Sequence, residues 1–348
     1  MLSIERRQTG DDEALFQGYR EVFGQELTES SRRRWRWQYL ENPMTGPEGP
    51  EIWVAREDGT PLGQYASMPV ILWWGGREVR ASWGMDVFLR PEARGKGLGA
   101  RLFTTWSDHV EVALGLGLTP SSYGLFQKLG YRDVGPVPFF QRILDPGAVA
   151  VRRLGTVLGP LGGWGLGAWL AVRHPAGAQR PAGLTVRPVT SFGPDYGALW
   201  ERARGSYLMC VRRDAAYLAW KYLACPTQSY QIQEAHRGRE LAGFAVSRHQ
   251  DYRGLRLGWI LDVFAHAGDQ EARDALLFAV LDSFREAGVA RVQAFSMNGA
   301  LARDLGRHGF LPGRSPMQFC VRAGVDSGSV FEELSRWHVV FGDSDMDR

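Results

Sequence analysis

The hydrophobic positions along the chain predict strands and helices in a regular order. Residues 2–9 are a predicted strand, and an amphipathic helix with apolar residues at helical spacing follows it. Residues 52–56, 62–72 and 77–88 are extended apolar segments, separated by an Asp-Gly turn and a Gly-Gly turn. This pattern predicts an antiparallel meander with helices beside it, which is an α+β domain with a mixed, largely antiparallel twisted sheet.

A glycine-rich turn follows the last strand of this meander. The segment Val87–Leu102 reads VFLRPEARGKGLGARL, so the strand ends near a proline and a helix begins within the glycines. Glycine lets the backbone approach a ligand closely, and the free N–H groups at a helix start attract phosphate. Arg94 and Lys96 add positive charge, and lysine occurs at only three positions in the chain. We therefore expect Arg94–Gly99 to bind a pyrophosphate group.

Three more elements complete the first half. The helix after the loop extends to about Val112, and residues 115–119 form a buried strand. Gly130 ends a short helix, because glycine accepts the left-handed backbone of a helix C-terminus. Residues 139–144 are the expected last strand.

Residues 146–183 differ in composition from the rest. Within them, Leu154–Val172 contains no charged residue, six glycines and one proline. We interpret 146–183 as a Gly/Trp-rich linker with a helical part packed between two domains, because the uncharged stretch is barely long enough to span a bilayer. The alternative is an interfacial membrane contact, which Arg152, Arg153 and Arg173 at its ends favour.

After the linker the pattern begins again. Three landmarks of the first half recur at offsets of 183, 176 and 179 residues: Trp37–Pro43 as Trp220–Pro226, Asp86–Phe88 as Asp262–Phe264, and Lys128–Tyr131 as Arg307–Phe310. Near-constant offsets predict a duplicated domain. We expect tandem domains at 1–145 and 184–325, followed by a solvated tail at 326–348.

The second copy lacks the glycine loop. In its place Ala265–Ala272 reads AHAGDQEA, with one glycine and two acidic residues. This segment should not hold a phosphate, so we expect one cofactor site in the chain.

Composition narrows the possible partners and compartments. The chain has 348 residues, 44% of them hydrophobic and 23% charged, with a net charge of +3, which gives no reason to expect a nucleic-acid partner. Its three cysteines are widely spaced, so they predict neither a disulfide framework nor a zinc site, and we expect no metal. The N-terminus is too charged for a signal peptide, so we expect a cytoplasmic location.

These motifs together resemble the GCN5-related N-acetyltransferase (GNAT) superfamily. The resemblance rests on the strand end Leu89-Arg90-Pro91, the loop Arg94-Gly95-Lys96-Gly97-Leu98-Gly99, and the turn Phe126-Gln127-Lys128-Leu129-Gly130-Tyr131 about 30 residues later. The strand before the loop follows an antiparallel meander, which argues against a dinucleotide-binding fold. The resemblance covers 1–145 well and 184–323 in a degenerate form, so the whole chain resembles a tandem GNAT protein.

The resemblance implies an acyl-CoA cofactor and assigns residues to it. Acetyl-CoA, or another acyl-CoA, would place its pyrophosphate on Arg94–Gly99 and its pantetheine arm along Phe88 and Leu89. Ser122 stands where the family often has a polar pantetheine contact, although capping of the following helix explains this serine equally well. The resemblance also implies that Phe126 contacts the cofactor.

The catalytic residues are less well defined than the loop. Asp86 is the candidate general base, since it precedes the strand segment that would carry the thioester. Its recurrence as Asp262 in a copy without the loop equally favours a role in the fold. Many GNAT enzymes have a tyrosine acid where this chain has Phe126, so Tyr123, one helical turn earlier, is a candidate acid or else a core residue.

Three functions follow from the resemblance. The favoured function is transfer of an acyl group from acyl-CoA to a primary amine, on a small-molecule or peptide acceptor that the sequence does not identify. The alternative is a non-catalytic acyl-CoA-binding or sensor protein, because Phe126 cannot donate a proton. A third is aminoacyl transfer from charged tRNA, which the intact loop and the modest charge disfavour.

Overall fold

The computed structural model describes residues 1–348 except 25–26, 174–176, 316, 325–328 and 347–348. The chain divides into two compact units. The N-terminal unit comprises 1–136, 216–228 and 316–333, and the C-terminal unit comprises 137–215, 229–315 and 334–348. Parts of the predicted linker (174–176) and of the predicted tail (326–328 and 347–348) lie outside the described residues.

The sheet of the N-terminal unit contains the predicted meander. Its strands lie in the order β1 (Leu2–Arg6), β2 (Ile52–Glu57), β3 (Thr60–Trp74), β4 (Arg77–Leu89), β5 (Val112–Leu116), β15 (Gln318–Ala323) and β6 (Arg132–Pro136). All neighbours in this order are antiparallel except β4 and β5, which are parallel. A parallel pair needs a crossover, and α3 (Leu98–Asp108) supplies it.

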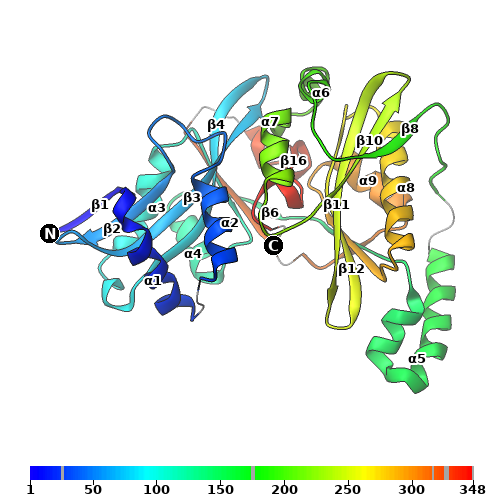
Figure 1. The fold of residues 1–348 in the computed structure, drawn as a ribbon, viewed down its shortest axis with the longest axis horizontal. Coiled ribbons are helices and arrows are strands. Elements are labelled where there is room, and N and C mark those ends of the chain that lie inside the picture. The colour runs from blue at the N-terminus through cyan, green and yellow to red at the C-terminus, as the bar shows by residue number, and fades with distance from the viewer. Residues whose placement is uncertain (25–26, 174–176, 316, 325–328, 347–348) are drawn as a thin grey trace. The chain divides into compact units, whose positions relative to one another are not determined.

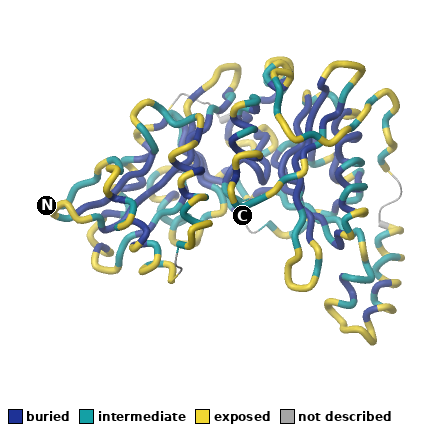
Figure 2. The backbone as a smooth tube through the Cα atoms, viewed as in Figure 1, coloured by how far each residue is buried: buried dark blue, intermediate teal, exposed yellow. Residues whose placement is uncertain are grey.

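Helices cover both faces of this sheet. On one face, α1 (Asp12–Phe23) and α2 (Glu29–Tyr39) pack through Leu15, Phe16 and Trp35 onto Ile52, Val54 and Phe88. On the other face, α3 and α4 (Pro120–Lys128) bury Leu102, Phe103, Trp106 and Phe126 against β2 and β3. Because both faces are covered, most residues of β2 and β3 are buried, as Figure 2 shows.

The sheet of the C-terminal unit repeats this arrangement. Its strands lie in the order β8 (Thr185–Val189), β10 (Gln231–Arg237), β11 (Glu240–Tyr252), β12 (Leu255–Ala265), β13 (Arg291–Phe295), β7 (Phe139–Ile143) and β14 (Leu311–Gly313). Again a single neighbouring pair, β12 with β13, is parallel. The helices are α6 (Asp195–Ala203), α8 (Gln270–Glu286) and α9 (Gly299–Arg307). Two mixed α+β sheets of one topology confirm the predicted fold class.

The sixth strand of each sheet comes from the other half of the chain. β7, the predicted last strand of the first half, lies between β13 and β14. β15, from the second half, lies between β5 and β6. The compact units therefore differ from the contiguous domains 1–145 and 184–325 that the sequence predicted, because each half completes its sheet with a strand of the other.

Two tryptophans at equivalent repeat positions meet in the N-terminal unit. Trp37 lies on α2, and Trp220 lies on the π-helical turn Ala219–Leu223, which follows α7 (Ala215–Leu218). Their rings stack with centroids 5.0 Å apart, and each indole Nε1 donates to the backbone carbonyl oxygen of the other, at 2.8 and 2.9 Å. The repeated aromatic residue is thus a core residue that joins the two halves of the sequence.

The predicted linker contains one long helical segment, α5 (Pro146–Arg173). Gly155, with φ 79° and ψ 176°, breaks it into two arms, which Figure 1 shows. The segment is part of the C-terminal unit. Among the described residues, the structure has no helix that is both long and apolar enough to cross a membrane.

The predicted solvated tail is buried over 337–344. β16 (Trp337–His338) pairs with β9 (Met209–Val211), and the Asp343 carboxylate binds the buried Arg213 guanidinium at 2.9 and 3.0 Å. The prediction of a solvated tail is therefore wrong for these residues, because the partner cation lies 130 positions earlier in the chain.

Candidate functional site

The candidate site begins where β4 and β5 separate. The two strands pair only over Ala81–Trp83 and Val112–Leu114, and β4 then continues to Leu89 with β3 alone beside it. In a strand, backbone N–H and C=O groups point alternately to the two sides. The free edge of β4 therefore presents backbone groups to whatever enters between the strands.

Asp86 lies at a β-bulge within this free segment of β4. Between the pairs Gln64–Phe88 and Ala66–Met85, β4 has one residue more than β3. Asp86 has a φ of +40°, which is uncommon outside glycine and costs conformational energy. The bulge therefore places a strained, half-buried carboxylate at the point where β4 leaves β5.

Two neighbouring side chains hold Asp86 in place. The Tyr39 hydroxyl donates to Asp86 Oδ2 at 2.5 Å, and Gln64 Nε2 donates to the Asp86 carbonyl oxygen at 3.2 Å. Tyr39 comes from α2, so the carboxylate lies on the sheet face that α1 and α2 cover. The sequence marked Tyr39 only as a repeat of Tyr222; its contact with Asp86, 47 residues later, carried no local signal.

The glycine loop has the geometry of an anion site. Gly95 and Gly97 have φ values of +75° and +73°, and a Cβ built on either would meet no atom within 4 Å. The first hydrogen bond of α3 runs from the Arg101 N–H to the Gly97 carbonyl oxygen at 3.2 Å. The N–H groups of Leu98 and Gly99 therefore precede the helical hydrogen-bond ladder, and the positive end of the helix dipole lies behind them.

The charged residues of the loop are exposed. Lys96 Nζ lies 3.2 Å from both carboxylate oxygens of Glu57, at the end of β2. Exposed ion pairs of this kind are weak, so a phosphate can take over the Lys96 ammonium at little cost. Arg94 and Lys96 thus give the loop a positive surface, and Glu57 is the residue of this surface that the sequence did not identify.

Phe88 and Leu89 point to opposite faces of the sheet. The Phe88 ring is buried beside Tyr19, with centroids 4.9 Å apart, on the face that α1 covers. Leu89 packs into the cluster of the α3 face. Both side chains thus pack toward helices, and their contacts with a pantetheine arm stay a prediction.

The three candidate site residues on α4 all contact other side chains or backbone groups of the N-terminal unit. The N-cap of α4 is Thr119, whose Oγ1 accepts from the Ser122 N–H at 3.2 Å, so Ser122 lies in the first turn of the helix and does not cap it. The Tyr123 hydroxyl donates to the Asp133 carboxylate, and this hydrogen bond raises the pKa of Tyr123 to about 12. The Phe126 ring is buried 4.3 Å from that of Tyr131, between ring centroids.

The equivalent position in the C-terminal unit has a different environment. Asp262 is buried, and its Oδ2 accepts from Arg213 Nε at 3.0 Å. Burial opposes ionisation, but the interactions with Arg213 and His338 together outweigh it and hold the pKa of Asp262 below its usual value. Asp262 is therefore part of a buried ionic cluster, whereas Asp86 is half-exposed and bound by a tyrosine.

Residues 337–344 pack where β12 extends beyond its pairing with β13. The Met297 N–H donates to the Val339 carbonyl oxygen at 3.3 Å, and the Phe341 ring lies 4.1 Å from that of Phe295, between centroids. Val340 joins the buried cluster that contains Ile260 and Val263 of β12. In the C-terminal unit, the chain itself therefore packs against the strands that correspond to β4 and β5.

Comparisons with known proteins support the resemblance. Residues 3–134 match the family model described as an acetyltransferase (GNAT) domain. No curated protein sequence matches the chain. A GCN5-related N-acetyltransferase structure from Anabaena variabilis is similar, at 15% identity and a TM-score of 0.63, over 93% of this chain and 73% of that one.

Two further structures share the fold. Saccharomyces cerevisiae N-myristoyltransferase with bound myristoyl-CoA matches at 14% identity and a TM-score of 0.58, over 97% of this chain and 89% of that one. Eis1 from Mycobacterium abscessus matches at 15% identity and a TM-score of 0.53, over 93% and 73% of the two chains. Residues 3–134 therefore match a GNAT domain, and the chain as a whole shares the fold of these acyltransferase structures.

Proposed function

We propose that this protein is an acyl-CoA-dependent N-acyltransferase with one cofactor site, in the N-terminal unit. The observation that carries the proposal is the combination of a free β4 edge with a helix start whose N–H groups lie in an open glycine loop. A strand edge suits the amides of a pantetheine arm, and the helix start suits a pyrophosphate. The C-terminal unit lacks the loop sequence, and Val340 packs there with Ile260 and Val263 of β12.

The cofactor is acetyl-CoA or a longer acyl-CoA. The pyrophosphate would lie on Arg94–Gly99, the pantetheine arm along the backbone of Phe88 and Leu89, and the thioester near the bulge at Asp86. The yeast N-myristoyltransferase that shares the fold holds myristoyl-CoA, so this fold accepts a long acyl chain in that protein. The acceptor is a primary amine of a small molecule or a peptide.

The proposed chemistry is direct transfer. The amine nitrogen attacks the thioester carbonyl carbon, a C–N bond forms, the C–S bond breaks, and CoA leaves as a thiolate. The Asp86 carboxylate, held by Tyr39, takes the proton that the amine loses. Protonation of the thiolate by Tyr123 stays a prediction. The hydrogen bond to Asp133 opposes it, because the Tyr123 hydroxyl already donates its proton to the Asp133 carboxylate. A thiol with a pKa of about 8.5 is an acceptable leaving group without an acid.

The test is Asp86→Asn, assayed by release of free CoA thiol from acetyl-CoA with a panel of small-molecule and peptide amines. Asparagine still accepts the Tyr39 hydrogen bond, so the fold and CoA affinity should be retained. Loss of the general base should lower kcat by about 10²- to 10⁴-fold. Asp58→Asn is the control, because Asp58 is also an aspartate at positive φ, +49°, but lies in the turn between β2 and β3, and it should leave kcat unchanged. Full activity of Asp86→Asn would contradict the role of Asp86.

A non-catalytic acyl-CoA-binding protein is the second candidate. It is favoured by the burial of Phe126, which replaces the usual tyrosine acid, and by the engagement of Tyr123 with Asp133. The same assay separates the two functions. If the wild-type protein binds CoA tightly and releases no thiol with any amine, the enzyme proposal is wrong.

A further inference from the structure

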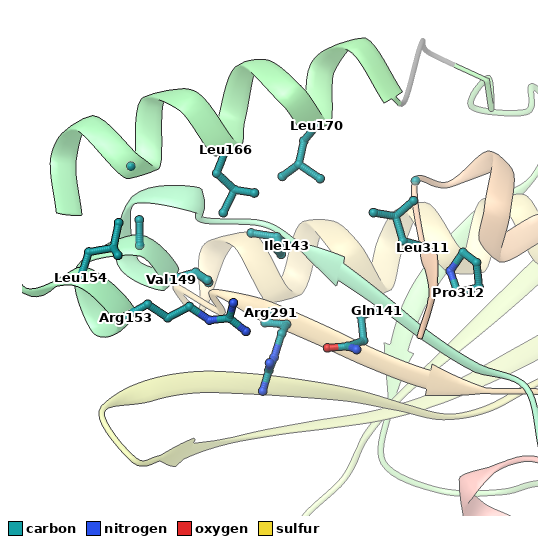
Figure 3. Close-up of a pocket in the computed structure, with 13 residues that line it drawn as sticks. Gln141, Ile143, Val149, Arg153, Leu154, Leu166, Leu170, Arg291, Leu311 and Pro312 are labelled. Atoms are coloured by element: carbon teal, nitrogen blue, oxygen red, sulfur yellow. The ribbon is translucent and has the colours of Figure 1, made fainter. Parts of the chain in front are cut away.

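A cavity of about 480 Å³ lies between α5 and the sheet of the C-terminal unit, formed by residues outside the proposed acyl-CoA site. Its floor comes from β7, β13 and β14, and its roof comes from the two arms of α5 (Figure 3). This volume lies within the range of small-molecule sites, about 300–1,000 Å³. No function described so far uses the cavity.

The roof is a closely packed helical hairpin. Glycines of the second arm, 156–173, face the first arm, 146–154. A Cβ on Gly159 would lie 2.6 Å from Val151 Cα, and one on Gly163 would lie 2.8 Å from Gly147 Cα. Such distances leave no room for larger side chains, so these glycines allow the two arms to pack closely. The hairpin therefore holds the leucines of both arms over the sheet in a defined position.

Most of the cavity wall is apolar. Leu166 and Leu170 point from the second arm toward Ile143 on β7, and Leu154 and Leu311 extend this surface (Figure 3). Among the described residues that line the cavity, none is acidic. A purely polar ligand would lose its hydration here without compensation, whereas a hydrocarbon chain would gain from leaving water.

Two arginines line the same cavity. Arg153 comes from the first arm of α5, and Arg291 is the first residue of β13 (Figure 3). Arg291 Nε is buried and has no hydrogen-bond partner among the described residues. Burial lowers the pKa of Arg291, and the neighbouring Arg153 charge lowers it further. Since no described residue that lines the cavity is acidic, the two guanidinium charges favour binding of an anion between them.

We propose that this cavity binds a long-chain carboxylate, with the carboxylate between Arg153 and Arg291 and the hydrocarbon chain between α5 and β7. The outer surface of α5 supports a lipid-like ligand. Val157, Leu161, Trp164 and Val172 are 85%, 74%, 79% and 83% exposed, an unusual concentration of apolar side chains on one helix. Figure 2 shows the exposed end of the hairpin in yellow.

The test is calorimetric titration of the full-length protein with palmitate below its critical micelle concentration. The double variant Arg153→Gln/Arg291→Gln should weaken binding at least tenfold. Arg152→Gln is the matched control, because Arg152 lies next to Arg153 but binds the Arg253 carbonyl oxygen at 2.7 Å and does not line the cavity. The control should bind palmitate like the wild type, and hexadecanol should bind the wild type more weakly than palmitate does. Thermal unfolding of each variant shows whether the fold is retained.

Three results would overturn the proposal. The first is no palmitate binding by the wild type, and the second is equal binding by the double variant and the control. The third is competition between CoA and palmitate, which would place palmitate in the proposed acyl-CoA site. Co-sedimentation with phosphatidylglycerol vesicles without palmitate binding would likewise refute the cavity and assign α5 to a membrane surface.

Discussion

Gly97 provides the sharpest test of the acyl-CoA loop. Its φ of +73° lies in the left-handed region, where a side chain costs about 1–2 kcal/mol. A built Cβ meets no protein atom within 4 Å, so Gly97→Leu should fold with little further loss. The added side chain would occupy the space that a pyrophosphate needs beside the N–H groups of α3. A hydrogen bond to a charged group contributes about 1.5–3 kcal/mol, so loss of two should weaken CoA binding by about 10²- to 10⁴-fold.

The measurement is calorimetric titration with CoA, together with thermal unfolding. Gly75→Leu is the matched control, because Gly75 also has a positive φ, +57°, and an open surrounding, but lies in the turn between β3 and β4. Both variants should lose similar stability, whereas Gly97→Leu alone should lose CoA binding. If the two variants bind CoA equally well, the loop does not hold the pyrophosphate.

Two further predictions concern the buried core. Burial lowers the pKa of His338 to about 4 and raises that of Asp343 to about 6. Between pH 4 and 6 the unfolded state binds more protons at the histidine, so this group makes the free energy of unfolding increase with pH. At the aspartate the folded state binds more protons, so this group makes the free energy of unfolding decrease with pH. His338→Gln should remove the histidine contribution, so that the change in the free energy of unfolding from pH 4 to 6, measured by denaturant unfolding, is less positive than in the wild type by about 2 kcal/mol; identical pH profiles of the two proteins would contradict this assignment. Trp37→Phe should cost about 1–3 kcal/mol, because it removes the stacked indole and leaves the Trp220 carbonyl oxygen without its donor. Unchanged stability in thermal unfolding would show that the reciprocal pair contributes nothing.

The glycine loop could be predicted because its information is local. Gly95 and Gly97 stand where the backbone must adopt positive φ, and α3 begins at Leu98 as the pattern indicated. The duplicated landmarks were equally informative, since they predicted two sheets before any strand order was known. The two sheets have the same order and each a single parallel pair.

The pairing of the strands could not be predicted in the same way. The sequence of β7, FFQRI, would suit a strand of either sheet, and only Val137 and Pro138 separate it from β6. Nothing in so short a connection indicates that β6 and β7 lie in different sheets. The contacts of Asp86 with Tyr39 and of Asp343 with Arg213 are likewise distant in sequence, so the candidate base lacked its positioning residue and the tail was assigned to solvent.

The two units differ at the point where their parallel strands separate. In both sheets a parallel pair of strands separates after three or four paired residues. In the N-terminal unit the free β4 edge ends at a glycine loop with an open helix start. In the C-terminal unit residues 337–344 pack against the corresponding strands. The buried Arg213 guanidinium donates hydrogen bonds to the carboxylates of both Asp262 and Asp343 there. Residues 337–344 thus cover strand surface in the C-terminal unit that would be open to a cofactor under the proposed function of the N-terminal unit. That Ala265–Ala272 has a single glycine and no glycine-rich loop is consistent with this packing of residues 337–344.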